Sequence, residues 1–238
     1  MAKRKAERPR DEKGRFVKKT TYIIIDDYGD TVPYTRREPV FGYAVTTTNN
    51  VQEMRDIARK NREFHNTVDE VKASNDTLFH KIRMSVEIRR AELDTNAYYV
   101  DKRRPPNGWD VEKREGESKR EYHERKNEVR NDVLYKVIQE SVKGLDGDVE
   151  VIVDYHTGNK HIRDRSRKLS NKTRQIHGDQ YKSERTDGQD ELYSDVLQVN
   201  DYVTNAAGSA VKGFPMRLLC IGTRMRRFKK WDRISEKP

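Results

Sequence analysis

The chain has 238 residues, of which 38% are charged and 33% hydrophobic, and its formal net charge is +10. This length suits one α/β domain, whose core would come from short, dense apolar runs. No apolar run is long enough to span a bilayer, and the first residues lack the apolar stretch of a secretory signal. The single cysteine, Cys220, excludes a disulfide within the chain and a cysteine-based zinc site. We therefore expect a cytoplasmic protein with no membrane partner.

The positive charge lies at the two ends of the chain. Residues 1–19 and residues 217–238 each carry a net charge of +6, which leaves about −2 for residues 20–216. These three ranges predict a disordered basic arm, a folded domain and a basic C-terminal tail. Basic ends on a nearly neutral body suit contact with nucleic acid, although they could equally serve only to keep the protein soluble.

Apolar patterns predict the elements of the first half of the chain. A strand is expected at residues 21–25, where a continuous β-branched run favours burial on both faces. A second strand at 40–48 would pair with it as a hairpin. Helices are expected from Asn49 or Asn50 to about Phe64 and again from about residue 75. A further strand covers 97–100.

The second half of the chain continues the alternation of helices and strands. The strongest helical spacing lies at 117–143, and a strand at 149–153 follows it. Residues 156–191 are polar and basic, which favours either a mobile substrate-contacting loop or disorder. A last helix is expected at about 195–211 and a last strand at 216–221. This order predicts an α/β domain with a mixed sheet flanked by helices.

Two predicted strands end in a carboxylate. Asp26 directly follows the run 21–25, and Asp154 directly follows the run 149–153. Residues at strand ends in open α/β sheets face the crevice where ligands bind, and carboxylates at close range repel unless a proton or cation lies between them. Mg²⁺ and Mn²⁺ prefer carboxylate oxygens. The pair therefore indicates a metal site, unless the two residues serve only to form turns.

Two other acids are weaker candidates for the same site. Glu70 lies in the segment EVKAS just before a predicted helix, where a solvent-exposed role is equally plausible. Asp201 lies within an apolar helical stretch, and burying an unpaired carboxylate is costly. Gln198 and Asn205 share its helix face by three- and four-residue spacing. This polar stripe is expected to face a site or another polar cluster.

Five segments together resemble the family catalogued as domain of unknown function 3800. The segment DDYGDT at 26–31 resembles its opening Asp-Glu-Ser-Gly-Asp type motif, and EVKAS at 70–74 its Glu-Leu-Lys type motif. YVDK at 99–102 and VIVD at 151–154 resemble its strand endings. LQVNDYV at 197–203 resembles its closing Leu-Gln-x-Ala-Asp-x-Val type motif. The matches follow the family's order and cover most of the predicted domain.

The resemblance implies a ribonuclease H-like α/β fold with basic N- and C-terminal arms. In folds of that type an Asp on the first strand, acids from other elements and an acid on a late helix bind two metal ions. It therefore implies that Asp26, Glu70, Asp154 and Asp201 are catalytic and bind Mg²⁺ or Mn²⁺. The chain departs from the family pattern at Asp27, Tyr28 and Asn200, which stand where the family has Glu, Ser and Ala.

Basic side chains are candidates for contact with nucleic acid. Lys72 could orient a phosphate, or it could simply be solvated. The loop after Asp154 and the C-terminal tail each gather cations, and the tail interleaves them with aromatic residues that could stack on bases. The candidates in these two segments are Arg163, Arg165, Arg167, Lys168, Arg226 and Arg227. Three histidines flank the loop and could shuttle protons, although exposed loop histidines commonly do not: His156, His161 and His177.

The sequence thus predicts a metal-dependent nuclease or a related phosphoryl-transfer enzyme that acts on DNA or RNA. An alternative is a non-catalytic nucleic-acid-binding module that keeps the fold. A further alternative is an interaction protein of a mobile element or virus, in which the acids only stabilise the sheet. The oligomeric state does not follow from the sequence.

Overall fold

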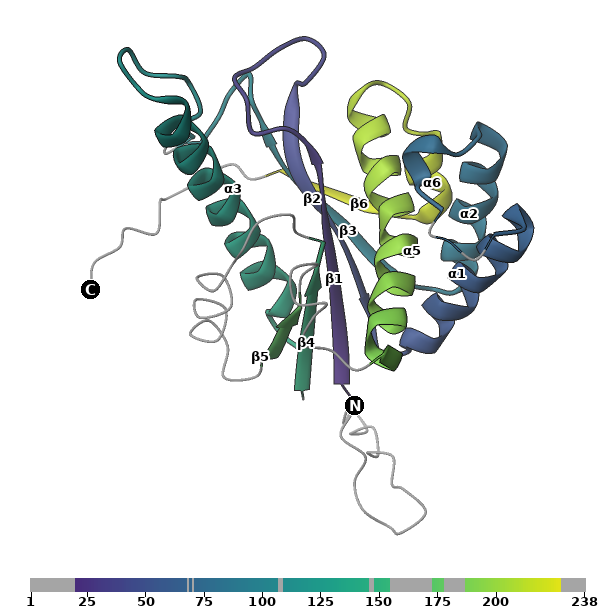
Figure 1. Ribbon diagram of the computed structural model, residues 1–238. Coiled ribbons are helices and arrows are strands. Elements are labelled where there is room, and N and C mark those ends of the chain that lie inside the picture. The colour runs from purple at the N-terminus through teal and green to yellow at the C-terminus, as the bar shows by residue number, and fades with distance from the viewer. Residues whose placement is uncertain are drawn as a thin grey trace, which may run out of the picture.

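The strand β1 (Thr20–Gly29) lies inside a mixed sheet that organises the protein (Figure 1). The computed structural model describes residues 20–67, 69, 71–106, 109–145, 148–154, 173–177 and 187–227. Six strands of this part of the chain form the sheet, in the order β5-β4-β1-β2-β3-β6. The other strands are β2 (Val40–Thr48), β3 (Asp94–Asp101), β4 (Asp148–Val153), β5 (Thr173–His177) and β6 (Arg224–Arg227).

The pairing of the strands divides the sheet into two parts. β1, β2 and β3 form an antiparallel meander. β4 pairs with β1 in parallel, β5 continues in parallel on β4, and β6 pairs in parallel with β3. The order of elements along the chain therefore produces the mixed α/β sheet that the alternation of apolar runs predicted.

One face of the sheet is covered by most of the helices (Figure 1). These are α1 (Val51–His65), α2 (Leu78–Arg90), α5 (Asp187–Val211) and α6 (Met216–Ile221), with the short 3-10 helix η1 (Ala73–Asn75) beside α5. Val199 and Val203 of α5 are fully buried in one cluster with Ile24 and Ala44 of the sheet. Ala206 and Ala207 of the same helix are also buried there, and their small side chains allow a close approach.

The opposite face is covered by α3 (Lys119–Val142), which stands apart from the other helices in Figure 1. Its apolar stripe, Val133, Leu134, Val137 and Ile138, is fully buried against residues that include Ile23 and Ile25. Ser118 and Glu121 form a reciprocal capping box at the start of α3. Consecutive isoleucines of β1 thus point to opposite clusters, which explains why this strand reads as a continuous apolar run.

The last part of the chain differs from the sequence-based prediction. Residues 216–221 form the helix α6 and not the predicted strand, because Leu218 and Ile221 are buried together at the three-residue spacing of a helix. The strand that does occur, β6, lies within the range predicted as a basic tail. It occupies an edge position beside β3, where a polar strand is tolerated.

The polar region before α5 also contains regular structure. β5 lies within the range 156–191, which was predicted to have none, and α5 begins at Asp187, earlier than the predicted 195. The strand predicted at 40–48 is confirmed with the same bounds, and those at 21–25, 97–100 and 149–153 are confirmed within longer strands. None of the helices in the described ranges is both long and apolar enough to cross a membrane.

Gly42 of β2 and Gly208 of α5 both lie close to Tyr28, and replacing each of them tests the packing around this side chain. A Cβ at Gly42 would overlap the carbonyl oxygen of Tyr98 and lie 2.7 Å from the Tyr28 hydroxyl, whereas a Cβ at Gly208 would meet Tyr28 at 3.6 Å. We expect Gly42→Ala to lower the free energy of unfolding by about 1–3 kcal/mol because of overpacking. Gly208→Ala should leave it unchanged or raise it by about 0.5–1 kcal/mol, since alanine favours the helix. Urea unfolding measures both, and equal effects would contradict this packing.

Candidate functional site

Asp26 and Asp154 meet because β1 and β4 are parallel neighbours. Ile25 is in register with Val153, and the backbone N–H of Asp154 donates a hydrogen bond to the Ile25 carbonyl at 2.9 Å. Alternation along each strand places both aspartates on the same side of the sheet as Ile24 and Ile152, which is the side covered by α5. Asp154 directly follows β4, as predicted, but Asp26 does not end its strand, because β1 continues to Gly29 and Asp26 is paired with Ala44 of β2. The two aspartates still lie side by side, since they follow the last registered pair of β1 and β4.

Asp201 approaches the same region from α5. Its side chain is half-buried, and its Oδ2 accepts a hydrogen bond from the backbone N–H of Ala73 at 2.7 Å. Gln198, one turn earlier on α5, donates through Nε2 to the carbonyl of Val71 at 3.3 Å. Gln198 and Asp201 thus hold the segment around η1 against α5, whereas Asn205, the third member of the polar stripe, accepts a hydrogen bond from Arg217 of α6.

The electrostatic surroundings of Asp26 are unusual for a carboxylate. The residue is 9% exposed. Burial raises the pKa of Asp26 well above its ordinary value, and the negative charges of Asp154, Asp27 and Asp201 raise it further. A hydrogen bond of 2.7 Å from the backbone N–H of Asp27 to its Oδ1 opposes the shift only in part. A buried carboxylate among other acids favours the binding of a proton or a cation.

Asp27 has a different environment, on the other side of the sheet. Its carboxylate forms an ion pair with Arg130 of α3, whose side chain is mostly buried. The two consecutive acids of β1 therefore differ in their surroundings. Asp27 forms an ion pair with Arg130, whereas Asp26 lies near the carboxylates of Asp154 and Asp201.

The other departures from the family pattern contribute to packing. Asn200 is fully buried, its Oδ1 accepts a hydrogen bond from Thr46 Oγ1 at 2.7 Å, and its Nδ2 donates to the Ala44 carbonyl at 3.4 Å. The buried Tyr28 donates through its hydroxyl to the Tyr98 carbonyl at 3.2 Å, with Gly208 of α5 above it. Both side chains thus help to hold α5 against the face of the sheet on which Asp26 and Asp154 lie.

The structure brings some predicted residues to the site and leaves others elsewhere. Lys72 is exposed within the segment held by Asp201 and Gln198. Arg226 lies 5.6 Å from the Tyr98 ring centroid, and Tyr98 belongs to the cluster on the α3 side, so Arg226 is on the opposite face from Asp26. Seven other predicted residues lie outside the described part of the chain: Glu70, His156, His161, Arg163, Arg165, Arg167 and Lys168. His177 lies in β5 and Arg227 in β6, but the structure does not describe their side chains.

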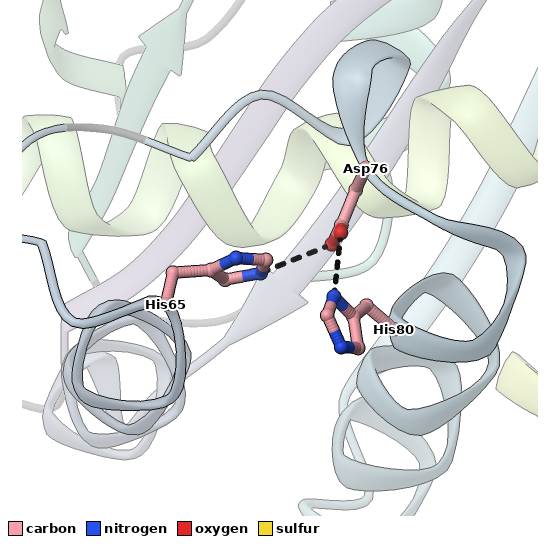
Figure 2. Close-up of side chains that lie close together, drawn as sticks. All are labelled: His65, Asp76 and His80. Atoms are coloured by element: carbon pink, nitrogen blue, oxygen red, sulfur yellow. Dashed lines mark hydrogen bonds and ion pairs between the residues drawn. The ribbon is translucent and has the colours of Figure 1, made fainter.

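A second group of possible metal ligands was missed by the sequence reasoning. Among the described residues, His65, Asp76 and His80 are the group of three whose ligand atoms all lie within 4.8 Å of one another (Figure 2). Asp26, Asp154 and Asp201 do not meet this distance criterion as a group. The only sequence signal for the second group is the four-residue spacing of Asp76 and His80, since His65 comes from another helix.

Comparison of the sequence with protein-family models and with curated proteins finds no match to either. The resemblance to the domain of unknown function 3800 family therefore rests on the five sequence segments alone.

The pKa of Asp26 generates a prediction about stability. The folded-state pKa of Asp26 is raised above the unfolded value of about 3.9. In the pH window between the two values, the folded state therefore binds more protons than the unfolded chain. The free energy of unfolding should therefore fall with rising pH in this window, in buffer without divalent cations. Asp26→Asn should remove the part of this pH dependence that Asp26 causes. It should also raise the free energy of unfolding at neutral pH.

Urea unfolding between pH 4 and pH 8 measures this effect. The matched control is Asp56→Asn, because Asp56 is exposed on α1, where it accepts hydrogen bonds from Gln52 and Arg59. The control should keep the slope of the parent protein. An Asp26→Asn variant with an unchanged slope would show that Asp26 does not carry the raised pKa.

Proposed function

We propose that this protein is a metal-dependent nuclease or a related phosphoryl-transfer enzyme that acts on nucleic acid. The observation that carries the proposal is that Asp26, inside β1, and Asp154, directly after the parallel strand β4, lie side by side, with the charge of Asp201 acting on Asp26 from α5. Carboxylates from two strands and a late helix are the donor set that hard divalent cations prefer.

The arrangement of the sheet supports a ribonuclease H-like fold within this proposal. The three antiparallel strands β1, β2 and β3 are followed in the chain by parallel strands that add to the free edge of β1. The resemblance to the ribonuclease H-like superfamily implies a catalytic Asp on the first strand, and Asp26 lies on β1. A fold alone does not determine an activity, so the proposal depends on the aspartates and not on the sheet.

Each residue of the proposed site would have a separate role. Asp26 and Asp154 would hold Mg²⁺ or Mn²⁺, with Asp201 and Glu70 completing the ligand set. The bound ions would supply an activated water and stabilise the leaving oxygen of a phosphodiester. Lys72 stands on the segment beside Asp201, where its ammonium group could orient a phosphate. The basic residues between 163 and 168 would contact the nucleic-acid backbone by charge.

Cleavage assays with Asp26→Asn and Asp154→Asn test the proposal. The parent protein should cleave at least one of single- or double-stranded DNA or RNA in the presence of Mg²⁺ or Mn²⁺, and not in EDTA. Each variant should reduce the rate more than about 100-fold, because loss of a metal ligand exceeds the usual effect of its outer-shell partners. Asp56→Asn should keep the parent rate, since it removes a similar charge from an exposed helix face.

Two outcomes would contradict the assignment. Cleavage that persists in both site variants would show that these aspartates are not the metal ligands. Salt-sensitive binding of nucleic acid without any metal-dependent cleavage would favour the non-catalytic binding module, since counterion release alone makes binding depend on salt.

A further inference from the structure

Three side chains from separate elements converge beside η1 (Figure 2). His65 is the last residue of α1, Asp76 lies between η1 and α2, and His80 is in the first turn of α2. His65 Nε2 lies 3.5 Å from Asp76 Oδ2, and His80 Nδ1 lies 2.9 Å from Asp76 Oδ1. The two imidazole rings are almost perpendicular, with centroids 4.7 Å apart.

The central carboxylate of this group is buried and held in place. The Asp76 side chain is 1% exposed. Its Oδ2 accepts a hydrogen bond from the Tyr202 hydroxyl at 2.7 Å, and its Oδ1 accepts one from the Thr77 backbone N–H at 2.8 Å. Tyr202 in turn accepts a hydrogen bond from Asn61 Nδ2 at 3.0 Å. Outer contacts of this kind fix the orientation of metal-binding carboxylates.

His65 provides an independent sign that a group is to be bound here. Its Nε2 is a buried atom that makes no hydrogen bond, although it points toward the Asp76 carboxylate (Figure 2). Buried polar atoms are almost always hydrogen-bonded, because leaving one without a partner is costly. This nitrogen lies 3.5 Å from Asp76 Oδ2, a long ion-pair contact that a cation beside Asp76 would replace by a coordination bond.

We propose that His65 Nε2, a carboxylate oxygen of Asp76 and His80 Nδ1 bind one divalent first-row transition-metal ion, with Zn²⁺ as the best fit. Two ligands bound to Zn²⁺ at about 2.0–2.1 Å in a tetrahedron lie roughly 3.3–3.5 Å apart. The contact of 3.5 Å between His65 and Asp76 matches this spacing, whereas the hydrogen bond of 2.9 Å between His80 and Asp76 would lengthen slightly as the ion replaces its proton. Imidazole ligands favour Zn²⁺ and its neighbours over Mg²⁺, which prefers oxygen alone. Three protein ligands leave a further position for water.

This site is distinct from the proposed nuclease centre and does not depend on it. The ion would join the end of α1 to the start of α2, and through Tyr202 it would join both to α5. Because it binds only where three elements meet, it would stabilise the folded state over the unfolded chain.

Metal titration of the full chain, without a histidine tag and freed of metal by EDTA and dialysis, tests the proposal. Calorimetry with Zn²⁺ should show one ion bound at this site, and Zn²⁺ should raise the thermal midpoint. Co²⁺ should give the visible absorption of a nitrogen- and oxygen-ligated ion. His65→Gln and His80→Gln should each weaken Zn²⁺ binding at least tenfold and abolish the Co²⁺ spectrum.

Matched variants separate this site from others on the chain. His123→Gln changes an exposed histidine of α3, and Asp154→Asn changes the proposed nuclease centre. Both variants should keep the Zn²⁺ affinity and the Co²⁺ spectrum of the parent protein. Tyr202→Phe keeps the ring but removes the hydrogen bond to Asp76, so it should weaken Zn²⁺ binding about 10-fold. Circular dichroism in EDTA checks that each variant is folded.

The proposal is overturned by either of two results. The first is a parent protein that binds neither Zn²⁺ nor Co²⁺, which would make the group a hydrogen-bonded histidine–carboxylate cluster only. The second is Zn²⁺ binding that is unchanged in folded His65→Gln and His80→Gln, which would place the ion elsewhere.

Discussion

The parallel pairing of β1 with β4 is the constraint on which the rest of the structure depends. β1 is paired on both edges and buried on both faces, so its position in the sheet is fixed by backbone hydrogen bonds and by two apolar clusters at once. The bond from Asp154 N–H to the Ile25 carbonyl extends that pairing past the end of β4. The carboxylates of Asp26, inside β1, and Asp154, directly after β4, are therefore brought together by backbone pairing alone.

The distribution of charge about β1 separates structural acids from candidate functional ones. On the α3 side, Arg130 neutralises Asp27. On the α5 side, Asp26 is buried among acids although a buried carboxylate is costly, and the helix above it contributes another acid, Asp201. A fold selected only for stability would gain from replacing Asp26 by an apolar residue. In this environment a bound proton or a bound cation would relieve the repulsion between Asp26 and the neighbouring acids.

Much of the sheet could be predicted from the sequence, because strands buried on both faces leave continuous apolar runs that end sharply. Asp26 and Asp154 were identified for the same reason: each follows such a run. The sequence was less informative where tertiary context overrides local pattern. The apolar run in 216–221 suited a strand as well as a helix, and only its burial beside α2 and α5 decides the matter. The polar strand β6 carries almost no apolar signal because it lies at an edge.

The group of His65, Asp76 and His80 could not be predicted for a different reason. Its members come from the end of one helix, a connecting segment and the start of another helix, and their meeting depends on how α1 packs beside α2. Spacing along the chain does not carry that information. The contribution of Tyr202 is equally hidden, since it lies 126 residues from the carboxylate that it contacts.

The adjacency of Asp201 and Tyr202 has a mechanical consequence. Consecutive residues of α5 bond to the two ends of the same short segment, Asp201 to the Ala73 N–H and Tyr202 to the Asp76 carboxylate. A movement of α5 along its axis by one residue, about 1.5 Å, would break both bonds together. The η1 segment therefore has little freedom to pivot and should open only when α5 does. The amide hydrogen of Ala73, although it belongs to a three-residue 3-10 helix, should then exchange with solvent as slowly as amides in the middle of α5.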